Sequence, residues 1–436
     1  MTRAVYRALA SVAEPALRIW LDRRVGRDKE EAQRLGERRG LASRPRPAGR
    51  VLWVHAASLG ETRSVLSLIE RIVVTHPDIH VLLTTFTVTA ARLVADRPPA
   101  NTIHQFVPLD VPRWIARFLD HWRPDAAIWV EGELWPNLVA AAHQRGLPMA
   151  LVNARLSSRS FARWRAARAV FPAPLEAFAP VLAQSAGDAE RLQQLGALDA
   201  RCVGNLKFDG APLAVDANEL ARLRAAVGRR PMWLAASTHP GEEVIVAQAH
   251  REMTTRWADL LTIVVPRHAT RGAEIEAILA AEGLSVARRT PGVAPSDTHG
   301  VYLADTMGEL GLFYRLAGLA FIGGSLVPHG GQNPLEPARL DCALVFGPHM
   351  TNFGDIAAAL IAARGAFEIR DAKSLAAVIG RMLDDASERA RCAAAAAGVA
   401  EAGRGAIDRV LAGLAPVLGA LGTAEDAPNT DADAPT

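Results

Sequence analysis

The strongest constraint on the fold is a repeated alternation of short apolar runs with segments of helical periodicity. Strands that alternate with helices form a parallel sheet with helices packed on both faces. The sequence therefore predicts an α/β protein with doubly wound sheets. In the first half of the chain, the predicted strands are 51–57, 79–86, 125–131 and 148–154.

The alternation is interrupted once, at residues 204–217, where the chain is rich in Gly, Pro and Asp. It then restarts, which predicts a second Rossmann-like domain of similar size. Two such domains would face each other across a cleft, where a ligand is expected. A chain of 436 residues is also too long for one ordinary core. The predicted strands of the second half are 231–237, 260–266, 318–324 and 342–348.

Five parts are expected along the chain, with boundaries set by these patterns and by composition. The tail holds mainly Ala, Asp, Pro and Thr, a composition typical of disorder. The parts are a basic amphipathic N-terminal segment at 1–44, a Rossmann-like domain at 45–208, a linker at 209–217, a second Rossmann-like domain at 218–421, and a disordered tail at 422–436.

The N-terminal segment is strongly basic, because residues 1–50 hold thirteen Arg or Lys against six acids, whereas the whole chain has a net charge of +3. Such a segment indicates an anionic partner, and its mixed apolar and basic character favours a membrane surface over nucleic acid. A solvated basic helix and a cleaved signal peptide stay open as alternatives. Pro15 is expected to kink the helix. The residues that can share its apolar stripe are Val5, Leu9, Val12 and Trp20.

Neither cysteine chemistry nor a bound cofactor is indicated. The three cysteines, Cys202, Cys342 and Cys392, are far apart and odd in number, which fits a reducing compartment. No clean G-x-G-x-x-G or Walker motif follows a predicted strand, and histidines do not cluster with acids at metal-ligand spacing. We therefore expect no cofactor and a metal-free mechanism.

Candidate acids in the first half follow predicted strands. In "HAASLGETRS" (55–64), small residues Ser58 and Gly60 would let a ligand approach the backbone, and Glu61 stands at a helix start. In "EGELWPN" (131–137), Glu131 and Glu133 could bind hydroxyls or share base work. Alternatively, Glu61 is an acid in a first helical turn, where the helix dipole stabilises it, and the stretch at 131–137 caps a helix.

Basic residues and hydroxyls follow other strands. Arg155 and Arg159 in "NARLSSRSF" could pair with a carboxylate or phosphate, or could be basic surface. In the second half, "ASTHPGEE" offers a helix N-terminus suited to an anion. The candidates for an anion there are Ser237, Thr238, Arg267 and His268, with Lys207 of "GNLKFD" as a further charge.

A glycine-rich loop at 321–338, "FIGGSLVPHGGQNPLEPA", connects a predicted strand to a helix. Gly323 and Gly324 end the strand, and Asn333 precedes a proline at the helix start. Such a loop suits a phosphate, and the carboxylate of Glu336 can accept both hydroxyls of a ribose. The alternative is a capping acid among structural glycines, but similar signals at neighbouring strand ends favour a nucleotide site.

Taken in order, these stretches resemble the family of 3-deoxy-D-manno-octulosonic acid (Kdo) transferases of lipopolysaccharide synthesis. Several motifs in one order over residues 53–338 make the resemblance specific. The matching text is "WVHAASLGE", "EGELWPN", "NARLSSRS", "GNLKFD", "ASTHPGEE", "PRH" and "GGSLVPHGGQNPLEPA".

The resemblance implies a GT-B glycosyltransferase with CMP-Kdo as donor and a lipid A precursor, lipid IVA, as acceptor. It implies an enzyme at the cytoplasmic face of the inner membrane of a Gram-negative bacterium. It makes Glu61 the general base and implicates Glu131 and Glu133. CMP would be held in the second half, with Lys207 near the phosphate, and no metal would be needed. Gly132 and Gln332 depart from the commoner Thr and His of the family.

Two other functions stay open from the sequence. The first is another GT-B enzyme, such as a UDP-sugar transferase or an epimerase, which would prefer UDP over CMP. The second is a non-catalytic membrane-surface protein with an inert double-Rossmann core, which would bind no nucleotide. The hypothesis that accounts for all the motifs together is an enzyme that transfers Kdo with inversion.

Overall fold

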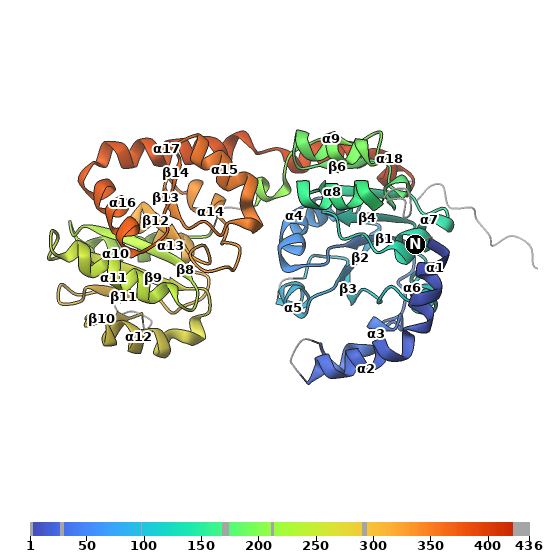
Figure 1. Ribbon diagram of the computed structural model, residues 1–436, viewed down its shortest axis with the longest axis horizontal. Helices are drawn as coiled ribbons and strands as arrows, with labels where there is room; N and C mark the ends of the chain where they lie inside the picture. Colours follow the sequence, from blue (N-terminus) through green and yellow to red (C-terminus); the bar gives the residue numbers. More distant parts are fainter. Residues whose placement is uncertain are drawn as a thin grey trace, which may run out of the picture. The chain divides into compact units, whose positions relative to one another are not determined.

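A computed structural model describes residues 3–26, 30–96, 98–167, 174–210, 213–289 and 294–421. The chain forms two compact units, one of residues 1–210 with 404–436 and one of residues 211–403. Each unit is a parallel sheet with helices on both of its faces (Figure 1). The tail predicted at 422–436 lies outside the described residues.

The first unit is built on a seven-stranded sheet in the order β3-β2-β1-β4-β5-β6-β7, and every pair of neighbours is parallel. The register aligns Trp53 of β1 with Leu82 on one side and Ala127 on the other. The strands are β1 (Arg50–His55), β2 (Ile79–Thr85), β3 (Thr102–Phe106), β4 (Ala126–Val130), β5 (Met149–Ala154), β6 (Val181–Ala183) and β7 (Arg201–Cys202).

Alternate residues of β1 face opposite layers of helices, as the twofold period of a strand requires. Leu52 and Val54 pack in one cluster with α4 and α18, whereas Val51 and Trp53 pack with α6, α7 and α9. Burial on both sides explains why this strand is apolar throughout. The helices of the unit are α1 (Arg3–Val12), α2 (Glu14–Val25), α3 (Leu35–Arg38), α4 (Leu59–Thr75), α5 (Val88–Asp96), α6 (Pro112–Trp122), α7 (Pro136–Gln144), α8 (Ser158–Ala167), α9 (Ala186–Gln194) and α18 (Ala406–Gly419), with 3-10 turns η1 (Ala32–Arg34), η2 (Pro174–Ala177) and η3 (Leu206–Asp209).

The second unit repeats this plan with a parallel sheet in the order β10-β11-β9-β8-β12-β13-β14. Trp233 and Ala235 of the central strand β8 pack in one cluster with α11, α12 and α16. The strands are β8 (Met232–Thr238), β9 (Leu261–Pro266), β10 (Val286–Arg288), β11 (Val301–Leu303), β12 (Leu319–Ile322), β13 (Ala343–Phe346) and β14 (Ala366–Glu368). The helices are α10 (Ala217–Val227), α11 (Glu242–Thr254), α12 (Gly272–Ala281), α13 (Leu310–Ala317), α14 (Leu335–Ala338), α15 (Gly354–Ala362), α16 (Ala372–Asp384) and α17 (Ala386–Ala402), with turns η4 (Ala269–Arg271) and η5 (Thr351–Phe353).

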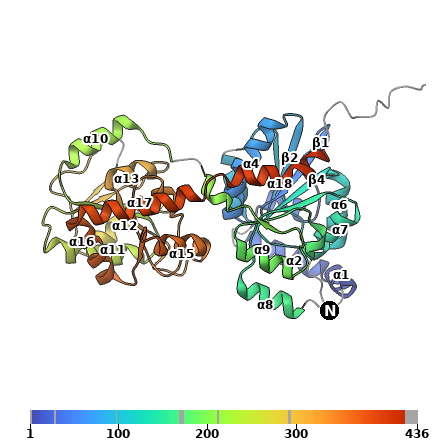
Figure 2. The same cartoon turned by 90° about the horizontal axis from the view of Figure 1, so that it is seen from above.

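The last helix, α18, belongs to the first unit, which corrects the sequence-based assignment of residues up to 421 to the second domain. It lies beside α4 in the first unit (Figure 2). Val410, Leu414 and Val417 join the apolar cluster under β1 and β4. The Asp209 carboxylate also accepts hydrogen bonds from the amides of Gly405 and Ile407, at 2.8 and 2.6 Å. These contacts place α18 in the first unit, although it follows the second unit in the sequence.

The N-terminal segment forms two helices, α1 and α2, and Pro15 lies in the first turn of α2 as expected from its effect on helices. Leu21 of α2 is fully buried and packs with Trp114. Tyr6 of α1 donates a hydrogen bond to Asp110 at 2.9 Å. The segment is therefore packed onto the first unit. No described helix has the length and apolar character needed to cross a membrane.

All eight strands predicted from apolar runs are present. Six others were not predicted, because they give too weak a signal in the sequence. β3 reads TIHQF, in which polar residues break the apolar run, and the remaining five have only two or three residues. Strands this short show no usable period.

The assignment of α18 to the first unit can be tested with Leu414→Ala. Leu414 is fully buried against the first sheet, so the cavity should lower the free energy of unfolding of that unit by about 2–5 kcal/mol. Hydrogen exchange should show faster exchange in β1 and β4 and unchanged exchange in β8 and β12. Leu198→Ala is the control, because Leu198 is 87% exposed. Faster exchange confined to β8 and β12 would contradict the assignment.

Candidate active site

Glu61 lies in the first turn of α4, directly after the carboxyl end of β1, and is 8% exposed. Ser58 is the N-cap of this helix, and its hydroxyl accepts from the Glu61 amide at 3.3 Å. The same hydroxyl donates to Glu61 Oε1 at 2.9 Å, and the Ala57 amide donates to Oε2 at 2.8 Å. Both carboxylate oxygens of Glu61 are thus held by the turn that begins α4.

The surroundings of Glu61 raise its pKa to about 7. Burial contributes most to this rise, and the negative charge of Glu131 adds to it, with a smaller contribution from Glu133. The hydrogen bonds from Ser58 and Ala57 act in the opposite direction because they stabilise the charged form. A carboxyl group that titrates near neutral pH is suited to taking a proton from a hydroxyl.

Glu131 follows β4 and has a left-handed backbone conformation, with φ of 64°. This conformation is unusual for a residue with a side chain and is concentrated at functional sites. The Arg155 amide donates a hydrogen bond to the Glu131 carbonyl oxygen at 3.3 Å. The Glu131 carboxylate forms an ion pair with Lys207, whose Nζ lies 3.3 Å from Glu131 Oε1. Glu133 is exposed on the same loop, where the atoms around its carboxyl group still desolvate it enough to raise its pKa.

Lys207 lies in η3 of the first unit, where its ammonium group pairs with Glu131. A network of amide side chains holds η3 in place. Asn153 Oδ1 accepts from the Leu206 amide at 3.0 Å, and Asn205 Oδ1 accepts from the Lys207 amide at 3.0 Å. Gln184 links the two asparagines, since it donates to the Asn153 carbonyl at 2.9 Å and accepts from Asn205 at 2.8 Å. These three amides were not predicted as site residues.

The other predicted residues of the first unit lie on the same edge or in the following helix. Ser58 is half-buried at the start of α4, and Gly60 is exposed in its first turn. Arg155 is half-buried directly after β5, whereas Arg159 is exposed in α8. The structure thus brings Glu61, Glu131 and Lys207 together, and leaves Arg159 on the surface.

The second unit has a tightly packed site at the carboxyl ends of β8 and β12. Ser237 has a left-handed φ of 56°, and Thr238 beside it is fully buried with no hydrogen-bond partner for its Oγ1 among the described residues. A Cβ at Gly323 would lie 2.3 Å from the Ser237 carbonyl oxygen. Only glycine fits there, which explains the first glycine of the 321–338 loop.

Glu242, at the start of α11, organises the glycine loop, although the sequence analysis did not single it out. It is fully buried and accepts four backbone hydrogen bonds. Oε2 accepts from His239 and Gly324 at 2.9 and 2.7 Å, and Oε1 accepts from Ser325 and Leu326, both at 3.0 Å. Burial raises the pKa of Glu242, and the four bonds oppose that rise. The carboxylate fixes the loop against β8.

Three imidazole rings and an arginine gather beside this loop. The ring of His239 lies 3.9 Å from that of His329 and 6.3 Å from that of His268, measured between centroids. Burial lowers the pKa of His239 to about 4, and the nearby His329, His268 and Arg267 lower it further. Burial and Arg267 also lower the pKa of His268. A phosphate could accept hydrogen bonds from these imidazoles and pair with the guanidinium of Arg267, so the cluster suits an anion.

Asn333 and Glu336 are joined at the far end of the loop. Asn333 Nδ2 donates to Glu336 Oε1 at 3.2 Å, and Asn333 Oδ1 accepts from the Leu335 amide at 3.0 Å. Gln332 Nε2 lies 3.0 Å from His239 Nε2, which links this end of the loop to the imidazole cluster. The predicted residues of the second unit lie at the carboxyl ends of β8, β9 and β12, in the loop that follows β12, or, for Glu336, in the first turn of α14. They are Ser237, Thr238, Arg267, His268, Gly323, Gly324, Asn333 and Glu336. In the part of the chain that the structure describes, no three His, Cys, Asp or Glu side chains group as metal ligands.

Solved structures share this architecture. A glycosyltransferase from Rickettsia africae ESF-5 superposes with a TM-score of 0.58 at 10% identity, covering 86% of this chain and 99% of that one. A putative UDP-N-acetylglucosamine 2-epimerase from Listeria monocytogenes gives 0.55 at 14% identity, covering 85% and 96%. Two Rossmann-like units with candidate ligand-binding residues at their strand ends define a protein of the GT-B fold class.

Sequence comparison then gives the family. A family profile described as 3-deoxy-D-manno-octulosonic-acid transferase (kdotransferase) matches residues 33–210. The 3-deoxy-D-manno-octulosonic acid transferase of Haemophilus influenzae is 33% identical over 425 residues, which cover 96% of this chain and 99% of that protein. That of Bordetella pertussis is 36% identical over 439 residues, covering 96% and 100%. The chain belongs to the Kdo transferase family.

The role of Glu242 can be tested with Glu242→Gln. The amide would keep one acceptor oxygen but turn its NH₂ group toward two backbone amides, which leaves buried donors unpaired. We expect the second unit to lose about 2–3 kcal/mol of unfolding free energy. Hydrogen exchange at residues 324–326 should become faster. Glu252→Gln, at an exposed position of the same helix, is the matched control. Unchanged exchange in the loop would contradict the role given to Glu242.

Proposed function

We propose that this protein is an inverting transferase that moves Kdo from CMP-Kdo onto a hydroxyl group of a lipid A precursor, lipid IVA, in lipopolysaccharide core synthesis. One observation carries the proposal. Glu61 presents a buried carboxylate, held at both oxygens, with a pKa raised to about 7. Membership of the Kdo transferase family supports the choice of sugar.

In the proposed mechanism, Glu61 takes the proton of the acceptor hydroxyl as that oxygen attacks the anomeric carbon of Kdo. The bond from this carbon to the phosphate oxygen of CMP breaks, and CMP leaves with the electron pair. The transition state resembles an oxocarbenium ion, as in glycoside hydrolysis. Glu131 and Glu133 raise the proton affinity of Glu61 and can accept hydrogen bonds from sugar hydroxyls.

The second unit would hold the donor. Ser237 and Thr238 offer hydroxyl groups at the end of β8. Arg267 would pair with the phosphate of the leaving CMP, and the imidazoles of His239 and His268 would donate hydrogen bonds to it. Gly323 and Gly324 allow close approach to the loop, and the Asn333–Glu336 pair can accept ribose hydroxyls. Because Arg267 and the hydrogen-bond donors of this cluster would stabilise the charge of the leaving group, we propose that the reaction needs no metal and no cofactor.

The first unit would hold the acceptor at a membrane surface. Among the residues that the structure describes, half of the ten exposed large apolar residues lie in α1 and α2, where Arg7, Arg18 and Arg23 are also exposed. This combination suits an anionic leaflet. The membrane would be the inner membrane of a Gram-negative bacterium, at its cytoplasmic face. Ser58, Gly60, Arg155 and Arg159 would then contact the acceptor. The exposed apolar residues are Val5, Leu9, Val12, Ile19 and Trp20.

The reaction itself is tested by incubating the full chain with freshly generated CMP-Kdo and a tetraacylated lipid A precursor, with and without EDTA. Mass spectrometry of the lipid should show added Kdo, and EDTA should leave the rate unchanged. No added mass, together with tighter binding of UDP than of CMP, would overturn the proposed donor. The absence of any nucleotide binding would overturn the enzyme assignment for this chain.

The role of Glu61 predicts a pH dependence. Below its pKa of about 7 the carboxyl group is protonated and cannot act as a base, so kcat should rise as the pH rises through about 7. Glu61→Gln should lower kcat by about 10² to 10⁴ and abolish this rise. Glu70→Gln is the control, because Glu70 is exposed on the same helix. Full activity in Glu61→Gln would remove the base role.

A further inference from the structure

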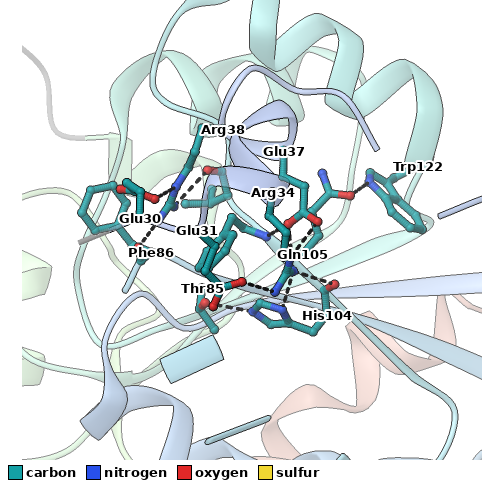
Figure 3. Close-up of polar contacts among 12 residues, drawn as sticks. Glu30, Glu31, Arg34, Glu37, Arg38, Thr85, Phe86, His104, Gln105 and Trp122 are labelled. Atoms are coloured by element: carbon teal, nitrogen blue, oxygen red, sulfur yellow. Dashed lines mark hydrogen bonds and ion pairs between the residues drawn. The ribbon is translucent and has the colours of Figure 1, made fainter. Parts of the chain in front are cut away.

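A buried polar cluster joins the segment of η1 and α3 to the edge of the first sheet (Figure 3). Glu37 is 1% exposed, accepts from the Phe106 amide at 2.7 Å, and pairs with Arg34 at 2.8 Å. Arg34 also contacts His104 Nδ1 at 2.9 Å, and burial lowers the pKa of His104 to about 3. His104 is therefore neutral, with Nδ1 accepting from Arg34 and Nε2 donating to Thr85 at 2.9 Å.

Arg38 of α3 lies beside this cluster and is fully buried. Its Nε donates to Glu30 at 2.9 Å, and its Nη2 donates to the carbonyl oxygen of Phe86 (Figure 3). Its guanidinium carbon lies 4.2 and 4.8 Å from the ring centroids of Phe106 and Phe86. A buried guanidinium is costly unless its partners are well placed, so these contacts fix it in one geometry.

The Phe86 peptide connects Arg38 to the candidate base. The amides of Phe86 and Thr87 both donate to the carbonyl oxygen of Ala57, at 2.9 and 3.1 Å. The amide of Ala57 in turn donates to Glu61 Oε2 at 2.8 Å. The carbonyl oxygen of Ala57 thus accepts two hydrogen bonds from the loop after β2, and the amide of Ala57 donates one to the Glu61 carboxylate.

We propose that Arg38 is a positioning residue for Glu61, because its guanidinium fixes the Phe86 carbonyl and thereby the loop that orients the Ala57 peptide against the Glu61 carboxylate. The inference rests on the proposed role of Glu61 as base. Arg38 contacts no reacting atom and acts only through Phe86 and Ala57. A hydrophobic residue could fill its volume but could not hold a carbonyl oxygen in a set direction.

The charged groups around Glu61 set the direction of the expected effect. Glu131 and Glu133 face it from the loop after β4, and Lys207 of η3 pairs with Glu131. His55, at the end of β1, is buried and neutral, with its pKa lowered to about 3. The Ala57 amide is thus one of the few groups that stabilise the charged form of Glu61. Loosening its hydrogen bond should raise the pKa of Glu61 further.

The test compares the pH dependence of kcat in the full chain and in Arg38→Met between about pH 5.5 and 9. We expect kcat to fall about tenfold at neutral pH, and its rise with pH to move upward by about 0.5 to 1 unit. Arg38→Lys keeps the charge for Glu30 but replaces the two-armed guanidinium with a single ammonium, so it should shift in the same direction. This variant decides the outcome if Arg38→Met does not fold.

Arg34→Met is the matched control, because Arg34 belongs to the same cluster but contacts Glu37 and His104 instead of Phe86. It should lower the melting temperature and leave the pH dependence unchanged. A folded Arg38 variant with the wild-type kcat and pH dependence would overturn the proposal. A pH dependence that persists in Glu61→Gln would instead overturn the base assignment, so the two failures are distinguishable.

Discussion

The hydrogen bond from the Ala57 amide to the Glu61 carboxylate is the interaction on which the site of the first unit depends. A carboxylate that is 8% exposed needs donors, and the turn between β1 and α4 supplies them through Ala57 and Ser58. Too many donors would keep the group charged but weaken it as a base, whereas burial with fewer would keep it protonated. The observed balance, with a pKa raised to about 7, suits proton transfer at neutral pH.

The second unit uses a buried carboxylate for a different purpose. Both carboxylate oxygens of Glu242 accept hydrogen bonds from backbone amides, four in all, so Glu242 holds a loop in place and has little acceptor capacity left for a ligand. Burial, more than the charges nearby, lowers the pKa of His239 beside this loop to about 4, so its imidazole is neutral at pH 7. One unit therefore presents acids at its strand ends, and the other presents imidazoles and the guanidinium of Arg267. This division fits a reaction that needs a base for one substrate and charge neutralisation for another.

Much of this arrangement could be predicted from the sequence, because parallel strands buried on both faces are apolar throughout and the residues that follow them share one edge. That logic predicted the positions of Glu61 and Ser237 at the carboxyl ends of β1 and β8. Glu242 was missed because an acid after a Pro-Gly turn is also what a helix start favours, and only the fold shows which amides it reaches. The return of α18 to the first unit depends on contacts between residues far apart in sequence, such as Asp209 with Gly405, and no local pattern signals it.

The Arg38–Glu30 pair shows why the N-terminal segment is more than a basic surface. A buried ion pair rarely adds net stability over an apolar replacement of equal volume, so its value lies in the directions it imposes. The hydrogen bond from Arg38 fixes the direction of the Phe86 carbonyl. Glu30 also forms an ion pair with Arg24 of α2, at 3.0 Å. The helix proposed to lie on the membrane is thereby joined, through two ion pairs and one loop, to the peptide that holds the base. A displacement of α2 could reach the loop that orients Glu61 through this buried pair, and also through Arg24, whose guanidinium carbon lies 5.9 Å from the Phe86 ring centroid. Of these two contacts, the buried ion pair is the one that fixes the direction of the Phe86 carbonyl.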